Sequence, residues 1–138
     1  MKTWLVNTNS KTSHHNPNGF KYMLRQNKAS AYYDRATEVD KIKEHDLVLL
    51  YHNDNRVIAV GAALTPFAGH DYGDLDQIEH WVDVNWLWKA NLNADFEPTN
   101  YINRHDLNIT MVNGTVINVT DQVDYRKLFE EIAKRQNF

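Results

Sequence analysis

The segment between residues 42 and 64 constrains the fold more than any other part of the chain. An apolar run at residues 47–51 is followed by a polar stretch at 52–56 and a second apolar run at 57–64. Two apolar runs of strand length on either side of a short polar turn predict a β-hairpin. Because both runs are almost continuously apolar, the hairpin is expected to lie inside a buried sheet.

The rest of the chain predicts further short elements around this hairpin. Strands are expected at residues 3–8, 29–33 and 81–88, and short helices at 20–26, 37–43 and 123–135. Residues 65–76 are expected to form a polar loop. An Asn113-Gly114 pair between the β-rich residues 107–112 and 115–119 predicts a second hairpin, since both residues tolerate the positive φ of a type I′ turn.

The last predicted helix has an amphipathic pattern. Thr120 or Asp121 is the expected N-terminal cap. The buried stripe is expected to consist of Val123, Leu128, Phe129, Ile132 and Ala133.

Length and composition predict one domain over residues 1–138. The chain has no cysteine, which excludes disulfides and thiolate metal sites. No apolar stretch approaches roughly 18 residues, so a cytoplasmic protein without membrane contact is expected. The elements predict an α+β fold: a strongly curved mixed β-barrel of five to six strands with two to three short helices, because curvature hides sheet edges.

Several local patterns occur in a recognisable order. Ala-Tyr-Tyr-Asp-Arg at 31–35 precedes His45-Asp46, which opens the first apolar run. Ile-Ala-Val-Gly-Ala follows at 58–62, and Val-Asp-Val-Asn-Trp at 82–86. This order, over roughly residues 3 to 88, resembles the EVE branch of the PUA-like superfamily. His45 departs from the pattern, because the family usually has Gly there.

The resemblance implies a function. Domains of this branch are related to YTH domains and to the DNA-recognition domains of modification-dependent restriction proteins. The implied partner is DNA or RNA carrying a modified base, which leaves its stack and enters an aromatic pocket. Such recognition needs no catalytic residue, metal or cofactor, and none is predicted.

Specific side chains are candidates for that pocket. Asn7 and Asn9, at the end of the first strand, would contact the base edge, because an amide both donates and accepts. The predicted stacking residues are one of the pair Tyr32 and Tyr33, together with Tyr72 and Trp86. The phosphate candidates are Lys11, Lys21, Lys28 and Arg35. For each of these aromatic residues the alternative is a place in the core, for the asparagines turn formation, and for the cations solvated surface.

Charge is unevenly distributed, although the formal net charge is only −3. Residues 1–35 carry six lysines and arginines against Asp34, whereas residues 71–97 carry seven acidic residues against Lys89. A basic region suits phosphates. The acidic segment 71–97 could instead contact a protein partner, so a protein-interaction or regulatory module is the alternative function.

An enzyme is not expected. Three His-Asp pairs begin at His45, His70 and His105, but no pair of histidines has the helical spacing of a zinc hydrolase. No serine has the context of a nucleophile elbow. A small hydrolase or nuclease is therefore the least favoured class.

Overall fold

The computed structural model describes residues 1–8, 19–52, 55–64, 68–70, 79–110 and 112–136, with the backbone alone for 33 and 68–70. The strands are β1 (Thr3–Asn7), β2 (Lys28–Tyr32), β3 (Leu47–His52), β4 (Arg56–Ala63), β5 (Ala68–His70), β6 (Glu79–Lys89), β7 (Ile102–Asn103) and β8 (Val116–Asn118). The helices are α1 (Gly19–Gln26), α2 (Tyr125–Arg135), and the 3-10 helices η1 (Tyr33–Lys41) and η3 (Arg104–Leu107).

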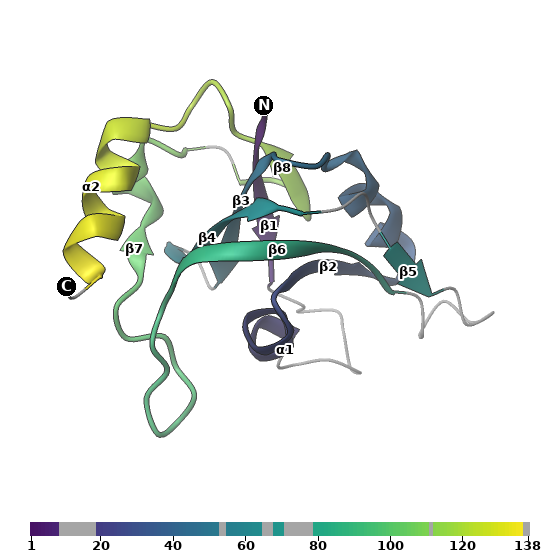
Figure 1. The fold of residues 1–138 in the computed structure, drawn as a ribbon, viewed down its shortest axis with the longest axis horizontal. Helices are drawn as coiled ribbons and strands as arrows, with labels where there is room; N and C mark the ends of the chain where they lie inside the picture. The colour runs from purple at the N-terminus through teal and green to yellow at the C-terminus, as the bar shows by residue number, and fades with distance from the viewer. Residues whose placement is uncertain (9–18, 53–54, 65–67, 71–78, 111, 137–138) are drawn as a thin grey trace.

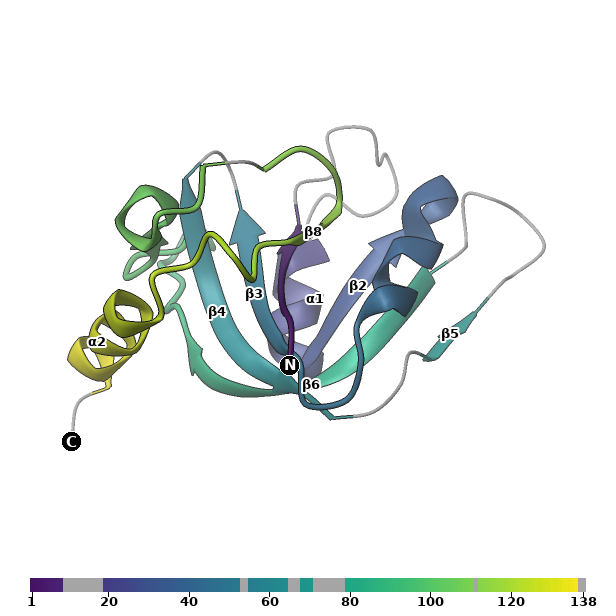
Figure 2. The ribbon, with the colours of Figure 1, turned by 90° about the horizontal axis from the view of Figure 1, so that it is seen from above.

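Six strands form one strongly curved mixed sheet in the order β2-β6-β4-β3-β1-β8 (Figures 1 and 2). β1 runs parallel to β3, and the other neighbours are antiparallel. β6 is long enough to pair with β2 through its first half and with β4 through its second half. The sheet bends so far that β1 approaches β2, although three strands separate them in the sheet order. The predicted α+β class and strong curvature are confirmed, as a half-barrel.

The α-helices cover different parts of this half-barrel. α1 lies between β1 and β2, at the opening of the curved sheet (Figure 2). α2 lies beside β7, on the side of the molecule away from β5 (Figure 1). The end of α1 lies next to β6, and these two elements form walls of the candidate site.

The predicted central hairpin is confirmed as β3 and β4. All six residues of β3 are buried, and so are six of the eight in β4, all but Arg56 and Ala62. Burial of each larger aliphatic side chain contributes about 1.5–3 kcal/mol to the free energy of unfolding. The core therefore forms where the sequence is most continuously apolar.

The carboxylate of Asp46 joins the start of the chain to the turn before β3. It accepts hydrogen bonds from the backbone N–H of Lys2 (3.0 Å) and Lys43 (3.0 Å) and from the indole N–H of Trp4 (2.9 Å). Burial alone would raise the pKa of Asp46, but these hydrogen bonds outweigh it and lower the pKa. His45 has φ of 73°, the left-handed geometry that Gly adopts more easily. The turn therefore keeps a glycine-like geometry although a histidine occupies it.

The predicted hairpin around Asn113-Gly114 is wrong. Leu107 ends η3 and Asn108 has φ of 64°, so the backbone turns where a strand was expected. The guanidinium of Arg104 holds this turn by donating to the carbonyl of Ile109 (2.9 Å). β8 pairs with the edge of β1, which gives its backbone a partner without the hairpin.

Three smaller predictions also need correction. α2 is capped by Asp124, whose carboxylate accepts the N–H of Lys127 (3.1 Å), and not by Thr120 or Asp121. Phe129 is 49% exposed, because α2 turns Leu128 and Ile132 toward the core. The predicted loop at 65–76 contains β5, which pairs with β6.

Candidate functional site

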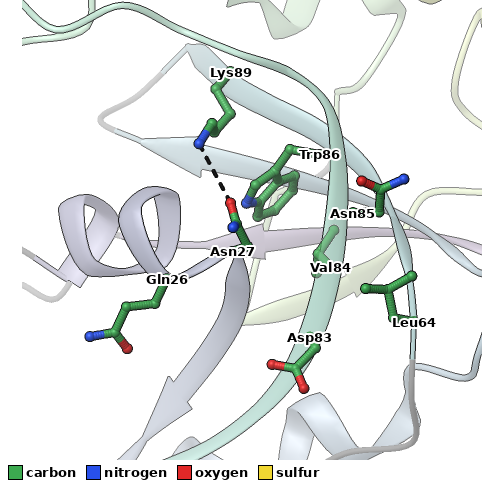
Figure 3. Close-up of a pocket in the computed structure, with 8 residues that line it drawn as sticks. All are labelled: Gln26, Asn27, Leu64, Asp83, Val84, Asn85, Trp86 and Lys89. Atoms are coloured by element: carbon green, nitrogen blue, oxygen red, sulfur yellow. Dashed lines mark hydrogen bonds between the residues drawn. The ribbon is translucent and has the colours of Figure 1, made fainter.

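A pocket of about 460 Å³ opens between the end of α1 and the second half of β6 (Figure 3). Its wall combines an indole, three carboxamides, a carboxylate, an ammonium and two aliphatic side chains. The lining residues are Gln26, Asn27, Leu64, Asp83, Val84, Asn85, Trp86 and Lys89. We call this the Trp86 pocket.

The pocket exists because β2 leaves β6 early. Pairing of the two strands ends with Lys28 opposite Asp83, and the carbonyl of Asn27 accepts the N–H of Val84 (2.9 Å). Asn27 has φ of 55°, which Asn tolerates better than most residues, and this turns the chain from α1 into β2. Beyond this point the edge of β6 faces the end of a helix instead of a strand.

A bulge and a glycine place Trp86 at the pocket wall. The register between β4 and β6 shifts from Val60–Trp88 to Gly61–Trp86, so Leu87 is an extra residue in β6. A Cβ on Gly61 would lie 2.5 Å from the carbonyl oxygen of Asn85 and 2.8 Å from Cε3 of Trp86. Gly61 therefore permits the indole to lie directly against β4.

Trp86 brings an unsatisfied donor to the pocket. The side chain is half-buried and packs against the core, and its Nε1 is buried with no hydrogen-bond acceptor in the part of the chain that the structure describes. Trp88 also has an unsatisfied Nε1, but it is 5% exposed, does not line this pocket, and has Arg135 5.9 Å from its ring centre. A buried N–H without an acceptor costs about 1–3 kcal/mol. Of these two tryptophans, Trp86 is the one that lines this pocket.

Lys89 supplies the positive charge. Its Nζ donates to the carbonyl of Leu24 in the last turn of α1 (3.1 Å) and to Oδ1 of Asn27 (3.5 Å), the pair drawn in Figure 3. A cation at a helix C-terminus is stabilised by the helix dipole. The ammonium is thus held in the same pocket wall as the indole of Trp86, and only two of its three protons have an acceptor among the described residues.

The pocket wall is amphipathic. The carboxamides of Gln26, Asn27 and Asn85 can each donate and accept, while the exposed carboxylate of Asp83 can only accept. This arrangement suits a flat ligand with both donors and acceptors at its edge.

A second group of buried polar side chains lies at the end of β3. The hydroxyl of Thr8 contacts Nδ1 of His52 (3.1 Å), and the imidazole packs on Phe20 with ring centres 4.1 Å apart. Burial, assisted by the positive charge of Arg56, lowers the pKa of His52 to about 4. His52 is therefore neutral at pH 7.

The described residues that were predicted for base binding do not come together in one site. Trp86 lines the pocket described above. Asn7 ends β1, where its N–H donates to Thr115 (2.7 Å), and Tyr32 packs against the core. Tyr33 begins η1, and its side chain lies outside the described residues, as do Asn9 and Tyr72 entirely.

The predicted phosphate contacts are equally dispersed. Lys28 forms an ion pair with Glu79 (2.7 Å), and Arg35 forms one with Glu38 (3.4 Å). Lys21 lies near the Trp86 pocket, in an adjacent pocket that also borders Lys89. Lys11 lies outside the described residues.

The acidic segment 71–97 is partly neutralised within the described residues. Glu79 pairs with Lys28, and Glu97 pairs with Arg56 (3.1 Å). Asp83 lines the Trp86 pocket and Asp95 is exposed. The described acids therefore do not form one uniformly acidic face.

Sequence reasoning did not identify Asn27, Asn85 or Lys89. Lys89 follows directly on the predicted strand at 81–88, but strict alternation places it on the opposite face from Trp86. The bulge at Leu87, which the sequence does not show, breaks this alternation. Asn27 lies between a predicted helix and a predicted strand, which marks it as a turn residue but carries no sign of a pocket.

The described residues show neither a metal-binding cluster nor a membrane-spanning helix. Among the described residues, no group of three or more His, Asp or Glu side chains is arranged to hold a metal ion. Within the same part of the chain, no helix has both the length and the apolar character to cross a membrane.

Comparison with known proteins gives fold relatives only. No protein-family model and no curated protein matches the chain. The structure is similar to that of a hypothetical protein from Leishmania major, with a TM-score of 0.59, 14% identity, and coverage of 99% of this chain and 98% of that one. It is also similar to a Rhodopseudomonas palustris protein solved by NMR, with a TM-score of 0.52, 8% identity, and coverage of 99% and 97%. At these identities the likeness shows a shared fold over the whole chain.

Proposed function

We propose that the protein binds DNA or RNA by accepting an unpaired or flipped, modified nucleobase in the Trp86 pocket. The observation that carries the proposal is the buried, unsatisfied indole N–H of Trp86 in a wall that also holds carboxamides and an ammonium. A ring nitrogen or carbonyl oxygen of a base would supply the missing acceptor, and this relieves the cost of the unsatisfied donor.

The size and chemistry of the pocket support a base as the ligand. Small-molecule sites occupy about 300–1,000 Å³, and the Trp86 pocket of about 460 Å³ lies in this range. Asn27 and Asn85 can pair with a base edge that both donates and accepts. Leu64, which is 49% exposed, offers apolar surface to a methyl group, whose removal from water is worth about 0.8 kcal/mol.

The PUA-like resemblance of the sequence points to the same class of ligand. The curved half-barrel is compatible with that assignment, and EVE-type membership remains part of the proposal. Lys89 would contact a phosphate, whereas Asp83 disfavours a phosphate on its own side of the pocket. The strand is therefore expected to leave the pocket past Lys89.

Fluorescence anisotropy with labelled single-stranded DNA and RNA tests the proposal. Oligomers would be unmodified or carry one methylated or hydroxymethylated base, at two salt concentrations. Base recognition predicts binding that depends on the modification and only mildly on salt, because phosphate contacts alone give a steep salt dependence. No binding to any oligomer would overturn the proposal.

Matched variants localise the binding. Trp86→Phe keeps an aromatic ring but removes the N–H, and it is expected to weaken binding about tenfold. Trp81→Phe is the control, since Trp81 is also half-buried on β6 but does not line the pocket. Asn27→Gly tests the carboxamide while retaining a residue that accepts positive φ. Equal losses for Trp81→Phe and Trp86→Phe would place the ligand elsewhere.

A further inference from the structure

A second pocket, of about 230 Å³, adjoins the Trp86 pocket and shares Lys89 with it. Two further cations border this pocket, and its other side chains are apolar. The lining residues are Lys21, Leu24, Arg25, Lys89, Ala90, Leu92 and Phe96. None of these carries a carboxylate, in contrast to the Trp86 pocket with Asp83.

The loop after β6 displays Phe96 with unusual geometry. Phe96 has φ of 62°, a conformation that costs a bulky L-residue about 1–2 kcal/mol, and its side chain is 52% exposed. Exposure of the aromatic ring and a strained backbone at one residue favour a binding role over a packing role.

Asn93 holds this turn. Its Oδ1 accepts the N–H groups of Asp95 and Glu97 (both 2.9 Å), and its carbonyl accepts the N–H of Phe96 (2.9 Å). A bridge between Leu92 and Pro98 closes the base of the loop. The aromatic ring is thus presented by a hydrogen-bonded turn.

The cations lie against aromatic rings, so the pocket offers both charge and stacking surface. The Nζ of Lys21 is 4.1 Å from the ring centre of Phe96, and the guanidinium carbon of Arg25 is 5.9 Å from that of Tyr22. A cation over one face of Phe96 leaves its exposed part to a second flat ring. The same ammonium would lie beside the phosphate of the nucleotide that carries this base.

We propose that the pocket at Lys21, Arg25 and Phe96 is a second nucleotide subsite. The ligand would then be a single strand of at least two nucleotides. This inference rests on the proposed function of the Trp86 pocket. One base enters the Trp86 pocket, Lys89 contacts the phosphate between the two nucleotides, and the neighbouring base stacks on Phe96. Single-stranded sites commonly combine cations with stacking aromatics in this way.

NMR titration with short ligands tests the second subsite, because amide shifts detect binding even at millimolar dissociation constants. The probes are N6-methyl-2′-deoxyadenosine and 5-methyl-2′-deoxycytidine, each as the nucleoside and as the two dinucleotides with thymidine on its 5′ or 3′ side. For the nucleoside that binds, one dinucleotide is expected to bind about tenfold tighter.

Variants assign this gain to the second pocket. Lys21→Gln and Phe96→Asn are each expected to remove most of the tenfold gain while nucleoside binding is unchanged. Asn at position 96 tolerates the positive φ of this turn. Phe96→Tyr keeps a stacking ring and should therefore keep the gain. The controls are Lys41→Gln and Phe129→Ala, which remove an exposed lysine and a 49% exposed phenylalanine that line neither pocket.

The two proposals fail in different ways. If a nucleoside binds but neither dinucleotide binds tighter, the second subsite is overturned and the base pocket stands. If the gain survives both Lys21→Gln and Phe96→Asn, the second subsite is likewise overturned. If no nucleoside or dinucleotide binds the unaltered protein, both proposals fall.

Discussion

At Asp46, three N–H donors converge on one carboxylate, whereas at Trp86 a buried N–H donor lies in a pocket wall with no acceptor from the described residues. Both regions place polar groups at the margin of the same sheet. The first is complete and holds the N-terminal strand against the turn before β3. The second leaves a hydrogen bond unmade, which costs stability unless a ligand completes it. The comparison separates groups that stabilise the fold from groups available for binding.

The largest effect is expected at the complete network. Asp46→Ala would leave the N–H groups of Lys2, Lys43 and Trp4 without their acceptor and lower the free energy of unfolding by roughly 4 kcal/mol. Urea denaturation measures this change. A loss below about 1 kcal/mol would show that water replaces the carboxylate, and the contrast with Trp86 would then disappear.

The buried imidazole of His52, at the opposite end of β3, extends the comparison to pH. Its pKa falls to about 4 in the folded state, so the unfolded chain takes up a proton first as pH falls. The stability that neutral His52 contributes is fully present above pH 6.5. The free energy of unfolding should therefore decline by about 3 kcal/mol as the pH falls toward 4. Denaturation at pH 7, 6 and 5 checks the slope, which His52→Gln should flatten. An unchanged slope in that variant would contradict a buried neutral His52.

Glu131 allows a check at lower pH. Hydrogen bonds from Arg135 and Lys127 lower its pKa to about 2, although burial opposes them. The stability that ionised Glu131 contributes is fully present above pH 4.5 and is lost only as the pH falls below that value. The His52 effect is therefore best measured above pH 4.5.

Gly61 joins the stability of the sheet to the shape of the pocket. Gly61→Ala would force its Cβ against the carbonyl of Asn85 and the ring of Trp86, lowering the free energy of unfolding by about 2 kcal/mol. The displaced indole should also weaken oligonucleotide binding. Ala62→Gly at the neighbouring position provides a control for the backbone change. Wild-type stability and binding in Gly61→Ala would mean that the indole does not rest on β4.

The smallest stability change is expected at the two unsatisfied indoles. Trp86→Phe and Trp88→Phe each remove a buried N–H that has no acceptor among the described residues, so each should change the free energy of unfolding by less than about 1.5 kcal/mol. Only Trp86→Phe should weaken ligand binding. Equal binding by the two variants would remove the distinction between the pocket and the core.

The fold was more predictable than the site. The β3–β4 hairpin was predicted because continuous apolar runs leave few alternatives, and β6 was predicted because its alternation extends over several residues. The Asn113-Gly114 hairpin failed because the turn chemistry is local, whereas the pairing of β8 with β1 and the turn at Asn108 are tertiary. Trp86 could be selected from the strand pattern. Asn27 could not, since its place opposite β6 depends on where β2 separates from that strand.

The unsatisfied indole can be observed directly. In ¹H–¹⁵N spectra each tryptophan gives an indole N–H resonance, and Trp86→Phe and Trp88→Phe assign the two that matter. On titration with the best-binding modified oligonucleotide, the Trp86 indole proton should shift downfield as it gains an acceptor, while that of Trp88 stays within a small fraction of this change. A Trp86 indole resonance that does not move at saturating ligand would contradict the proposal that this pocket receives the base.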